Sequence, residues 1–182
     1  MKRIFTCLIA LLCVITGMAQ NNSKSMEKKV LVAYYSATGT TKAKAEALAR
    51  AVDATLYEIT PEAKYTPEDL DWRNKNSRSS KEMTNAESRP PLGGTRINAN
   101  EYDVIFIGFP IWWDLCPRVV NTWIESQNLK GKTVFPFATS GSSDISNSQK
   151  DLRRLYPDVN WQEGKLLNGS EEEAASWIKS VR

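Results

Sequence analysis

Short apolar runs alternate with amphipathic segments along most of this chain, and this alternation restricts what the chain can fold into. Residues 30–35 and 104–109 are apolar almost throughout, which is typical of strands that are covered on both faces. Between these runs, residues 40–52 gather their apolar side chains on one helical face. Strands that alternate with helices favour a parallel sheet with helices on both sides. The sequence therefore predicts an α/β fold.

The rest of the chain continues this alternation. Three further strands are expected, over residues 55–60, over residues 133–138 and within residues 159–167. Three further helices are expected, one after Pro117, one from Asp144 or Ser146 to Leu155, and one after the capping sequence that starts at Ser170. Pro136 is unusual in this scheme, because strands in the middle of a sheet normally avoid proline.

Residues 61–100 interrupt the pattern. This segment is rich in Pro, Asn, Ser and Arg, and its apolar residues show little periodicity. It is predicted to be a long loop with short helical turns around residues 67–72 and 80–86. A connection of this length inside a domain usually carries function.

The composition excludes several kinds of chemistry. The chain contains no histidine, which rules out a Ser-His-Asp triad, a Cys-His pair and an HExxH zinc site. We expect no metal site. The formal net charge of +3 is too small to indicate a nucleic-acid partner. Any chemistry must therefore come from other side chains, from the backbone or from a bound cofactor.

Residues 1–19 have the pattern of a secretory signal peptide. Lys2 and Arg3 precede an apolar run over residues 4–15, and small residues before Gln20 suit cleavage after Ala19. A membrane anchor is the alternative, but the run is shorter than the roughly 18–20 residues that span a bilayer. We expect an exported, periplasmic protein with a flexible segment over residues 20–29, a folded domain over residues 30–182 and no membrane span after cleavage.

Cleavage would also change the charge and the thiol content. Loss of Lys2 and Arg3 lowers the formal net charge from +3 to +1, and loss of two cysteines leaves Cys116 alone. A single cysteine forms no internal disulfide, so the domain depends on its apolar core. Cys116 is interpreted as a small residue packed at a helix start. The alternative is an exposed, redox-active thiol whose pKa is lowered by the helix.

Ligands of open α/β sheets bind beyond the carboxyl ends of the strands, so the loops that leave the strands are candidate sites. Residues 36–41, with the sequence SATGTT, follow the first strand and open a helix. The amides of a helix start attract a phosphate, and the four hydroxyls of this loop add uncharged donors. The loop is neither a Walker sequence nor GxGxxG. The same composition also suits an ordinary polar turn with a threonine cap.

The loops after the third and fourth strands complete the candidate site. Trp112 and Trp113 are adjacent, and adjacent side chains point in different directions, so we expect one indole to face the core and the other a planar aromatic ligand. Alternatively, both indoles pack beneath the long loop. Residues 139–144, with the sequence TSGSSD, offer amides and hydroxyls that suit the polar edge of a flat heterocycle, although many such turns look alike.

Together the three loops resemble those of the flavodoxin family, and in particular short flavodoxin-like proteins with a PIWW loop. The matching stretches are VLVAYYSATGTT, DVIFIGFPIWW, PRVVNTWIES and LKGKTVFPFATSGSSDISNS. The resemblance extends from residue 30 to the C-terminus, and residues 61–100 are its least distinctive part. It implies a three-layer flavodoxin-like sandwich with a five-stranded parallel sheet in the order 2-1-3-4-5, and one bound FMN.

By position, the resemblance implies three groups of FMN-binding residues. The phosphate would be held by Ser36, Thr38, Gly39, Thr40 and Thr41, with the backbone of Ala37. The isoalloxazine ring would be lined by Pro110, Ile111, Trp112 and Trp113. The polar edge of the ring would meet Ser140, Gly141 and Ser142. No residue is expected to be catalytic, because the cofactor carries the chemistry.

Three functions remain open at this point. The first is an FMN-binding electron carrier that serves a redox partner protein or a small-molecule acceptor. The second is an FMN-dependent NAD(P)H quinone or nitro-compound reductase. Its second substrate would lie against residues 61–100, where the candidates, which are also typical of solvated loop residues, are Trp72, Arg73, Arg78 and Arg89. The third is a binding module that keeps the fold without the cofactor.

Two features depart from what the resemblance implies. Flavodoxins that carry electrons are typically acidic, which helps them meet basic partners, whereas the expected mature charge here is near +1. Asp114 stands where relatives often place a glycine, which changes backbone conformation more easily than aspartate. A carboxylate beside the ring would also disfavour its reduction, so we expect Asp114 to lower the flavin potential.

Overall fold

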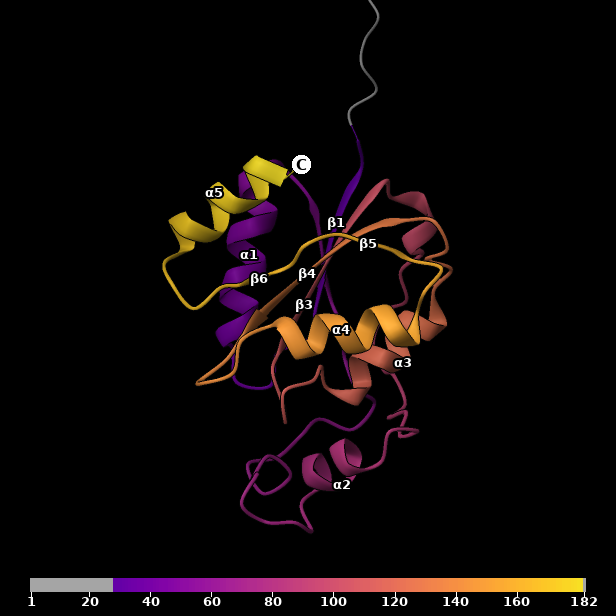
Figure 1. Ribbon diagram of the computed structural model, residues 1–182, viewed down its shortest axis with the longest axis vertical. Coiled ribbons are helices and arrows are strands. Elements are labelled where there is room, and N and C mark those ends of the chain that lie inside the picture. The colour runs from indigo at the N-terminus through magenta and orange to yellow at the C-terminus, as the bar shows by residue number, and fades with distance from the viewer. Residues whose placement is uncertain (1–27, 182) are drawn as a thin grey trace, which may run out of the picture.

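Parallel strands at the centre of the molecule form the sheet that the sequence predicts (Figure 1). The structure, a computed structural model, describes residues 28–181, so the predicted signal peptide and nearly all of the segment before residue 30 lie outside the described residues. The order β2-β1-β3-β4-β5 confirms the predicted arrangement. The strands are β1 (Val30–Tyr34), β2 (Thr55–Glu58), β3 (Val104–Pro110), β4 (Thr133–Thr139), β5 (Asn160–Trp161) and β6 (Lys165–Leu166).

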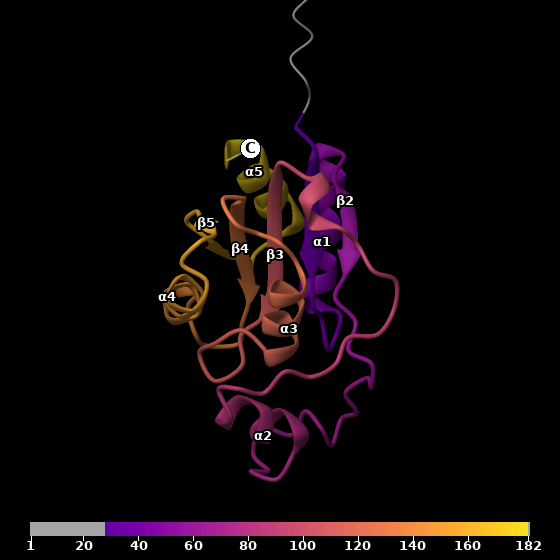
Figure 2. The same cartoon turned by 90° about the vertical axis from the view of Figure 1, so that its right-hand side faces the viewer.

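Helices cover both faces of this sheet, and successive strand residues point to opposite faces. Helices α1 (Thr40–Val52) and α5 (Glu171–Val181) pack against the face that carries Val32 and Phe106. Helices α3 (Arg118–Ser126) and α4 (Ser146–Leu155) pack against the face that carries Leu31 and Ile105. Figure 1 shows α1 and α5 on one side of the strands and α3 and α4 on the other, and Figure 2 shows the strands side by side with α3 in front of them. Among residues 28–181, no helix is long and apolar enough to cross a membrane.

Pro136 explains why the last strand is split into β5 and β6. The carbonyls of Lys132, Val134 and Ala138 accept hydrogen bonds from this edge, so the even-numbered residues of β4 face it. Pro136 faces the same edge but has no N–H to donate, and the pairing is interrupted there. Gly164 lies opposite, where an added Cβ would be only 2.4 Å from the Pro136 carbonyl oxygen. The predicted fifth strand is therefore present in two short pieces.

The segment between β2 and β3 carries two short helices, α2 (Arg78–Thr84) and η1 (Ala99–Glu101). Helix α2 falls where a helical turn was predicted. Ser77 caps its N-terminus by accepting a hydrogen bond from the amide of Ser80. Residues 67–72 form turns, in which the amide of Leu70 donates to the carbonyl of Thr66 at 3.1 Å. In both views α2 lies beyond the carboxyl ends of the strands, on the side where ligands are expected (Figure 1, Figure 2).

Candidate functional site

The first loop turns sharply between β1 and α1. Gly39 has a φ of 91°, in the left-handed region that glycine adopts at little cost, and its amide donates to the Ser36 hydroxyl at 3.1 Å. Thr38 and Thr40 are exposed with their hydroxyls 3.5 Å apart, while Ser36 and Ala37 are half-buried. The residue immediately before α1 is Gly39, which has no side chain to cap the amides of the first turn.

Thr41 differs from its neighbours in this loop. It is only 1% exposed, and its hydroxyl lies 2.8 Å from that of Thr139 at the end of β4. Thr41 therefore joins the first loop to the third. Its hydroxyl is buried against Thr139, so a phosphate at this helix start would meet the exposed Thr38 and Thr40 and the free amides of the first turn.

The second loop contains a tight reversal. The amide of Trp112 donates to the carbonyl of Leu115 at 2.9 Å, and the amide of Leu115 donates back at 3.0 Å. Both central residues, Trp113 and Asp114, have positive φ angles of 47° and 63°. Two such residues define a type I′ turn, which glycine and asparagine normally occupy. Holding non-glycine residues there costs about 1–2 kcal/mol each.

The two adjacent indoles separate as predicted. Trp112 is half-buried and meets Tyr35 and Tyr65 edge-on, with ring centroids 5.7 and 5.3 Å away. Trp113 is 47% exposed. The left-handed turn therefore directs one indole toward the core and leaves the other accessible to a ligand.

Hydrogen bonds connect the third loop, residues 139–144, to Asn168 and to the second loop. Ser140 exchanges two hydrogen bonds with Asn168, and its hydroxyl accepts from the amides of Ser142 and Ser143. The Ser143 hydroxyl in turn donates to the Asp114 carboxylate. Together with the Thr41–Thr139 contact, these bonds join the three predicted loops, because β1, β3 and β4 end at the same edge of the sheet.

A cleft of about 480 Å³ opens between the second loop, the third loop and the segment that carries α2. Six of the predicted residues line it: Ile111, Trp112, Trp113, Ser140, Gly141 and Ser142. Five other residues complete the lining: Leu70, Trp72, Ser79, Asp114 and Ser143. Pro110 ends β3 beside Thr139, and neither Pro110 nor any residue of the first loop lines the cleft.

Sequence reasoning missed the contributions of Leu70 and Ser79. Neither residue lies in a recognisable motif, and only the folding of residues 61–100 over the carboxyl edge brings them to the cleft. The turn sequences around residues 67–72 and 80–86 are the signals that marked this stretch as structured. Asn168 was missed for the same reason, because its partner Ser140 is distant in sequence.

Of the four residues considered for a second substrate, only Trp72 lines the cleft, and it is 63% exposed. The three arginines do not line the cleft. Arg73 lies over the ring of Trp72, 4.5 Å from its centroid. Arg78 pairs with Glu82 at 2.7 Å, and Arg89 pairs with Glu125. Both arginines already hold carboxylates: the Arg78 pair lies within α2, and the Arg89 pair attaches its segment to α3.

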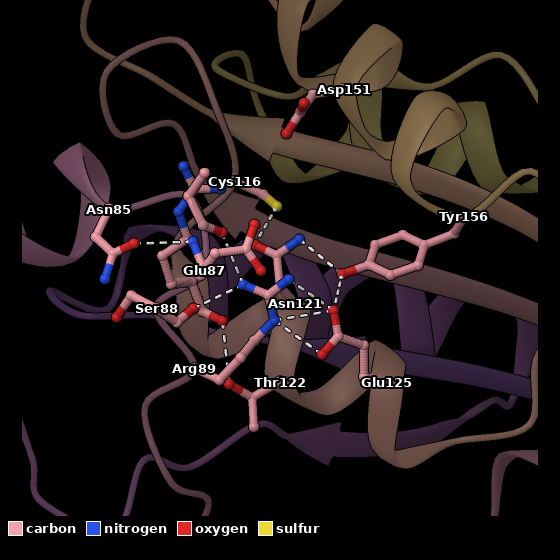
Figure 3. Close-up of polar contacts among 12 residues, drawn as sticks. Asn85, Glu87, Ser88, Arg89, Cys116, Asn121, Thr122, Glu125, Asp151 and Tyr156 are labelled. Carbon is pink, nitrogen blue, oxygen red and sulfur yellow. Dashed lines mark hydrogen bonds and ion pairs between the residues drawn. The ribbon is translucent and has the colours of Figure 1, made fainter.

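Cys116 is packed inside the protein. It is 1% exposed, its sulfur lies 3.6 Å from the Oδ1 of Asn121, and burial raises its pKa to about 12 (Figure 3). The neighbouring Asn121 and Glu125 both bind the hydroxyl of Tyr156. The interpretation as a packed residue is confirmed, and the exposed thiol with a lowered pKa is not observed.

Comparisons with solved structures place this architecture among flavoproteins. A candidate flavoprotein from Bacteroides uniformis is 57% identical, with 84% of this chain and 98% of that chain covered and a TM-score of 0.80. One from Bacteroides eggerthii is 54% identical, with 85% and 98% covered and a TM-score of 0.81. A Lactobacillus acidophilus flavoprotein in complex with FMN, at 22% identity, covers 83% and 99% with a TM-score of 0.67 and shows the fold alone.

The family models give a direct assignment. The flavodoxin model matches residues 29–181, which include all three loops and the segment that carries α2. No curated protein matches the chain. The match spans the whole described domain and agrees with the strand order and with the loops at its carboxyl edge. This chain belongs to the flavodoxin family.

Proposed function

We propose that this protein binds one FMN and transfers electrons between two redox partners. The observation that carries the proposal is that a cleft with an accessible indole and a polar loop opens at the same carboxyl edge of the sheet as the uncapped start of α1. Membership of the flavodoxin family supports FMN as the cofactor. FMN supplies the ability to accept and donate one or two electrons.

The residues at the start of α1 fit a phosphate. Helix amides that no side chain caps carry a partial positive charge, and an anion there is stabilised by about 0.3–1 kcal/mol. The hydroxyls of Thr38 and Thr40 add donors on the exposed side of the loop. Lys42 is also exposed on the first turn of the helix. The sites implied for Ser36, Ala37 and Thr41 stay predictions, with Thr41 contributing its amide.

The cleft fits a flat ring with one polar edge. Its volume of about 480 Å³ is within the range of small-molecule sites, and Trp113 offers an indole face. Gly141 presents backbone without a side chain, and an added Cβ would meet nothing within 4 Å. Ser140 and Ser142 orient the polar side of the cleft. These residues would position the ring and exclude water from one face of it.

A second candidate function is reduction of a small acceptor by an FMN-dependent enzyme. The observation that favours it is the wall built by residues 61–100, since Leu70, Trp72 and Ser79 extend the cleft beyond the two flavodoxin loops. Trp72 is 63% exposed at this wall and could stack against a second planar molecule. A carrier that only meets protein partners has no need of such a wall.

An anaerobic reductive titration of the purified holoprotein tests both functions. The carrier function predicts a yellow protein that takes up electrons from a chemical reductant but oxidises NADH and NADPH no faster than free FMN does. Rapid NAD(P)H oxidation in the presence of a quinone or a nitro compound would instead establish the enzyme. A colourless protein that takes up no added FMN would contradict both and favour a non-redox binding module.

We also propose that the protein is exported after cleavage following Ala19. The support is the basic start, the apolar run and the small residues of the leader. N-terminal sequencing of protein recovered from the periplasm of an expressing bacterium should give Gln20 as the first residue. Recovery of the uncut chain from the cytoplasm would contradict export.

A further inference from the structure

Three aromatic rings contact one another where the segments that follow β1, β2 and β3 meet. Tyr35 directly precedes the first loop, Tyr65 lies in the segment after β2, and Trp112 belongs to the second loop. The Trp112 ring centroid is 5.7 Å from that of Tyr35 and 5.3 Å from that of Tyr65, and both contacts are edge-on. The two tyrosine ring centroids are 5.9 Å apart. These three residues form an aromatic triad.

Trp112 connects this triad to the cleft between the second and third loops, here called the flavin cleft. Trp112 lines the flavin cleft, whereas the two tyrosines do not. The Trp112 amide also closes the reversal that directs Trp113 outward, by its bond to the Leu115 carbonyl. The contacts of Trp112 with the tyrosines therefore help to fix the position of the cleft wall.

A charged pair on α2, which lies beyond the carboxyl ends of the strands, holds the Tyr65 ring (Figure 1). The Tyr65 hydroxyl donates to the Glu82 carboxylate, and the Arg78 guanidinium lies over the Tyr65 ring, 4.0 Å from its centroid. Arg78 also donates to Glu82 at 2.7 Å and to the Ala63 carbonyl at 2.7 Å. The Glu82 side chain is only 11% exposed, so water competes little for these bonds. A bonded hydroxyl and a cation over the ring together restrict its orientation.

These contacts differ from the other attachment of the same segment. The pair of Arg89 with Glu125 joins the segment to α3, and neither residue lines the flavin cleft. The contacts of Tyr65 instead end at Trp112, which does line it. Walls that bind a ligand firmly are locked by packing and hydrogen bonds from residues behind them. Tyr65 has the geometry of such a supporting residue.

We propose that Tyr65 is a positioning residue for the flavin ring, held in place by the Arg78–Glu82 pair of α2. The proposal rests on the proposed FMN site, because it concerns the indole wall of that site. Since Tyr65 does not line the flavin cleft, it would act on the ring through Trp112. Helix α2 would thereby contribute to flavin affinity without touching the flavin.

Tyr65→Leu and Tyr65→Phe test this in the deflavinated mature protein, titrated with FMN and separately with riboflavin. Leucine removes the aromatic ring, so both flavins should bind about tenfold more weakly and by the same factor, because they share the ring system. Phenylalanine keeps the contacts with Trp112 and loses only the bond to Glu82, so both affinities should fall about threefold.

Tyr57→Leu is the matched control. Tyr57 is also half-buried, its ring centroid lies 6.0 Å from that of Trp123, and its hydroxyl donates to the Thr95 carbonyl at 3.0 Å. Neither Tyr57 nor Trp123 lines the flavin cleft. This substitution removes a similar set of contacts, so it should destabilise the fold to a similar degree while leaving both flavin affinities within about twofold of the original.

Nitrogen relaxation of the indole N–H groups in the deflavinated protein gives a readout that needs no flavin. The order parameter of the Trp112 indole, whose signal is identified with Trp112→Phe, should fall in Tyr65→Leu and stay unchanged in Tyr57→Leu. If the original chain bound no FMN, the proposed function would fail, whereas a fall in this order parameter would still support the positioning of Trp112 by Tyr65.

Four results would overturn the proposal. Tyr65→Leu could bind both flavins as tightly as the original chain, or Tyr57→Leu could weaken them equally, which would make the effect one of general stability. Tyr65→Leu could weaken FMN alone, which would place the effect at the phosphate. The Trp112 order parameter could also stay unchanged in Tyr65→Leu. Tyr65→Phe binding as tightly as the original chain would overturn the part assigned to α2.

Discussion

Trp113 and Asp114 occupy a backbone conformation that their side chains disfavour, and the surroundings hold them there. The Asp114 carbonyl accepts a hydrogen bond from the Ser148 hydroxyl at 2.8 Å, and the Asp114 carboxylate accepts one from Ser143. Both donors come from the region that follows β4. Strained residues that are held in this way concentrate at functional sites. Here the strain places an indole and a carboxylate at the mouth of the cleft.

Asp114→Asn should raise the flavin potential. Asparagine tolerates the left-handed conformation and keeps an oxygen for Ser143, so the turn is retained while the negative charge is lost. Removing a charge several ångströms from the ring relieves about 0.5–1.5 kcal/mol of repulsion, which corresponds to a rise of about 20–60 mV for a one-electron step. The midpoint potential of the purified holoprotein, measured against a reference dye, checks this.

Asp53→Asn is the matched control for that measurement. Asp53 also has a positive φ, of 50°, but it ends α1 at the opposite end of the helix from the first loop. The same change of side chain should leave the potential unchanged there. An unchanged or lower potential in Asp114→Asn would show that this carboxylate does not act on the ring.

Cys116 should resist alkylation in the folded protein. Burial raises the pKa of its thiol to about 12, whereas an unfolded chain ionises near 8.5. The folded state therefore holds the thiol neutral. The contribution of this thiol to the free energy of unfolding is complete below the unfolded pKa and is lost as the pH rises toward 12. With protein lacking residues 1–19, iodoacetamide should react fully in urea and very slowly without it. Rapid native labelling would contradict the packed thiol.

At the scale of elements, the segment between β2 and β3 is held to the sandwich by a small polar cluster. Arg89 donates to both oxygens of Glu125 on α3, at 2.9 and 2.8 Å, and the same carboxylate accepts from Tyr156 after α4 (Figure 3). The Arg89 guanidinium lowers the pKa of Glu125. These bonds join three segments that sequence order keeps far apart.

Arg89→Met should loosen this segment. Methionine retains much of the apolar stem but donates no hydrogen bond, so the free energy of unfolding should fall by about 1–2 kcal/mol. Limited proteolysis should also cut within residues 61–100 sooner. Arg50→Met is the control, because its pair with Glu171 is exposed on both sides and contributes little. Equal effects of the two substitutions would show that the Arg89 cluster does not anchor the segment.

Gly164→Ala should disturb the edge where Pro136 interrupts strand pairing. An added methyl group would lie 2.4 Å from the Pro136 carbonyl oxygen and 2.7 Å from its ring, so backbone must shift, at a cost of about 1–3 kcal/mol. Gly141→Ala, where nothing lies within 4 Å, should change the free energy of unfolding by less than about 0.5 kcal/mol. Urea unfolding compares them. If Gly164→Ala left the free energy of unfolding unchanged, this edge of the sheet would accommodate a methyl group without cost.

At the scale of the whole molecule, the sheet and its helices could be predicted because local signals agreed. The buried run at 104–109, the helix over 40–52 and the capping sequence at Ser170 each fixed an element within about two residues of its observed bounds. The split of the last strand could not be predicted from the pattern alone. It depends on which edge of β4 Pro136 faces, and this is set by the register between strands.

The meeting of the three loops at one edge could be predicted in the same way, while the FMN-binding roles of their residues stay predictions. The rule that ligands bind at the carboxyl edge of the sheet selected the three loops, and the resemblance to flavodoxins supplied the individual residues. The contributions of Leu70, Ser79 and Asn168 were not predictable, because each depends on a tertiary contact of a segment without periodicity. The burial of Thr41 was hidden for the same reason, since its partner Thr139 is on another strand.

Titration of the deflavinated protein with FMN, and separately with riboflavin, measures whether the chain holds the flavin by its phosphate. We expect quenching of flavin fluorescence at one FMN per chain, with riboflavin bound at least about a hundredfold more weakly because it lacks the phosphate that the start of α1 would hold. Equal affinity for the two flavins, or no saturable binding of FMN, would contradict this expectation.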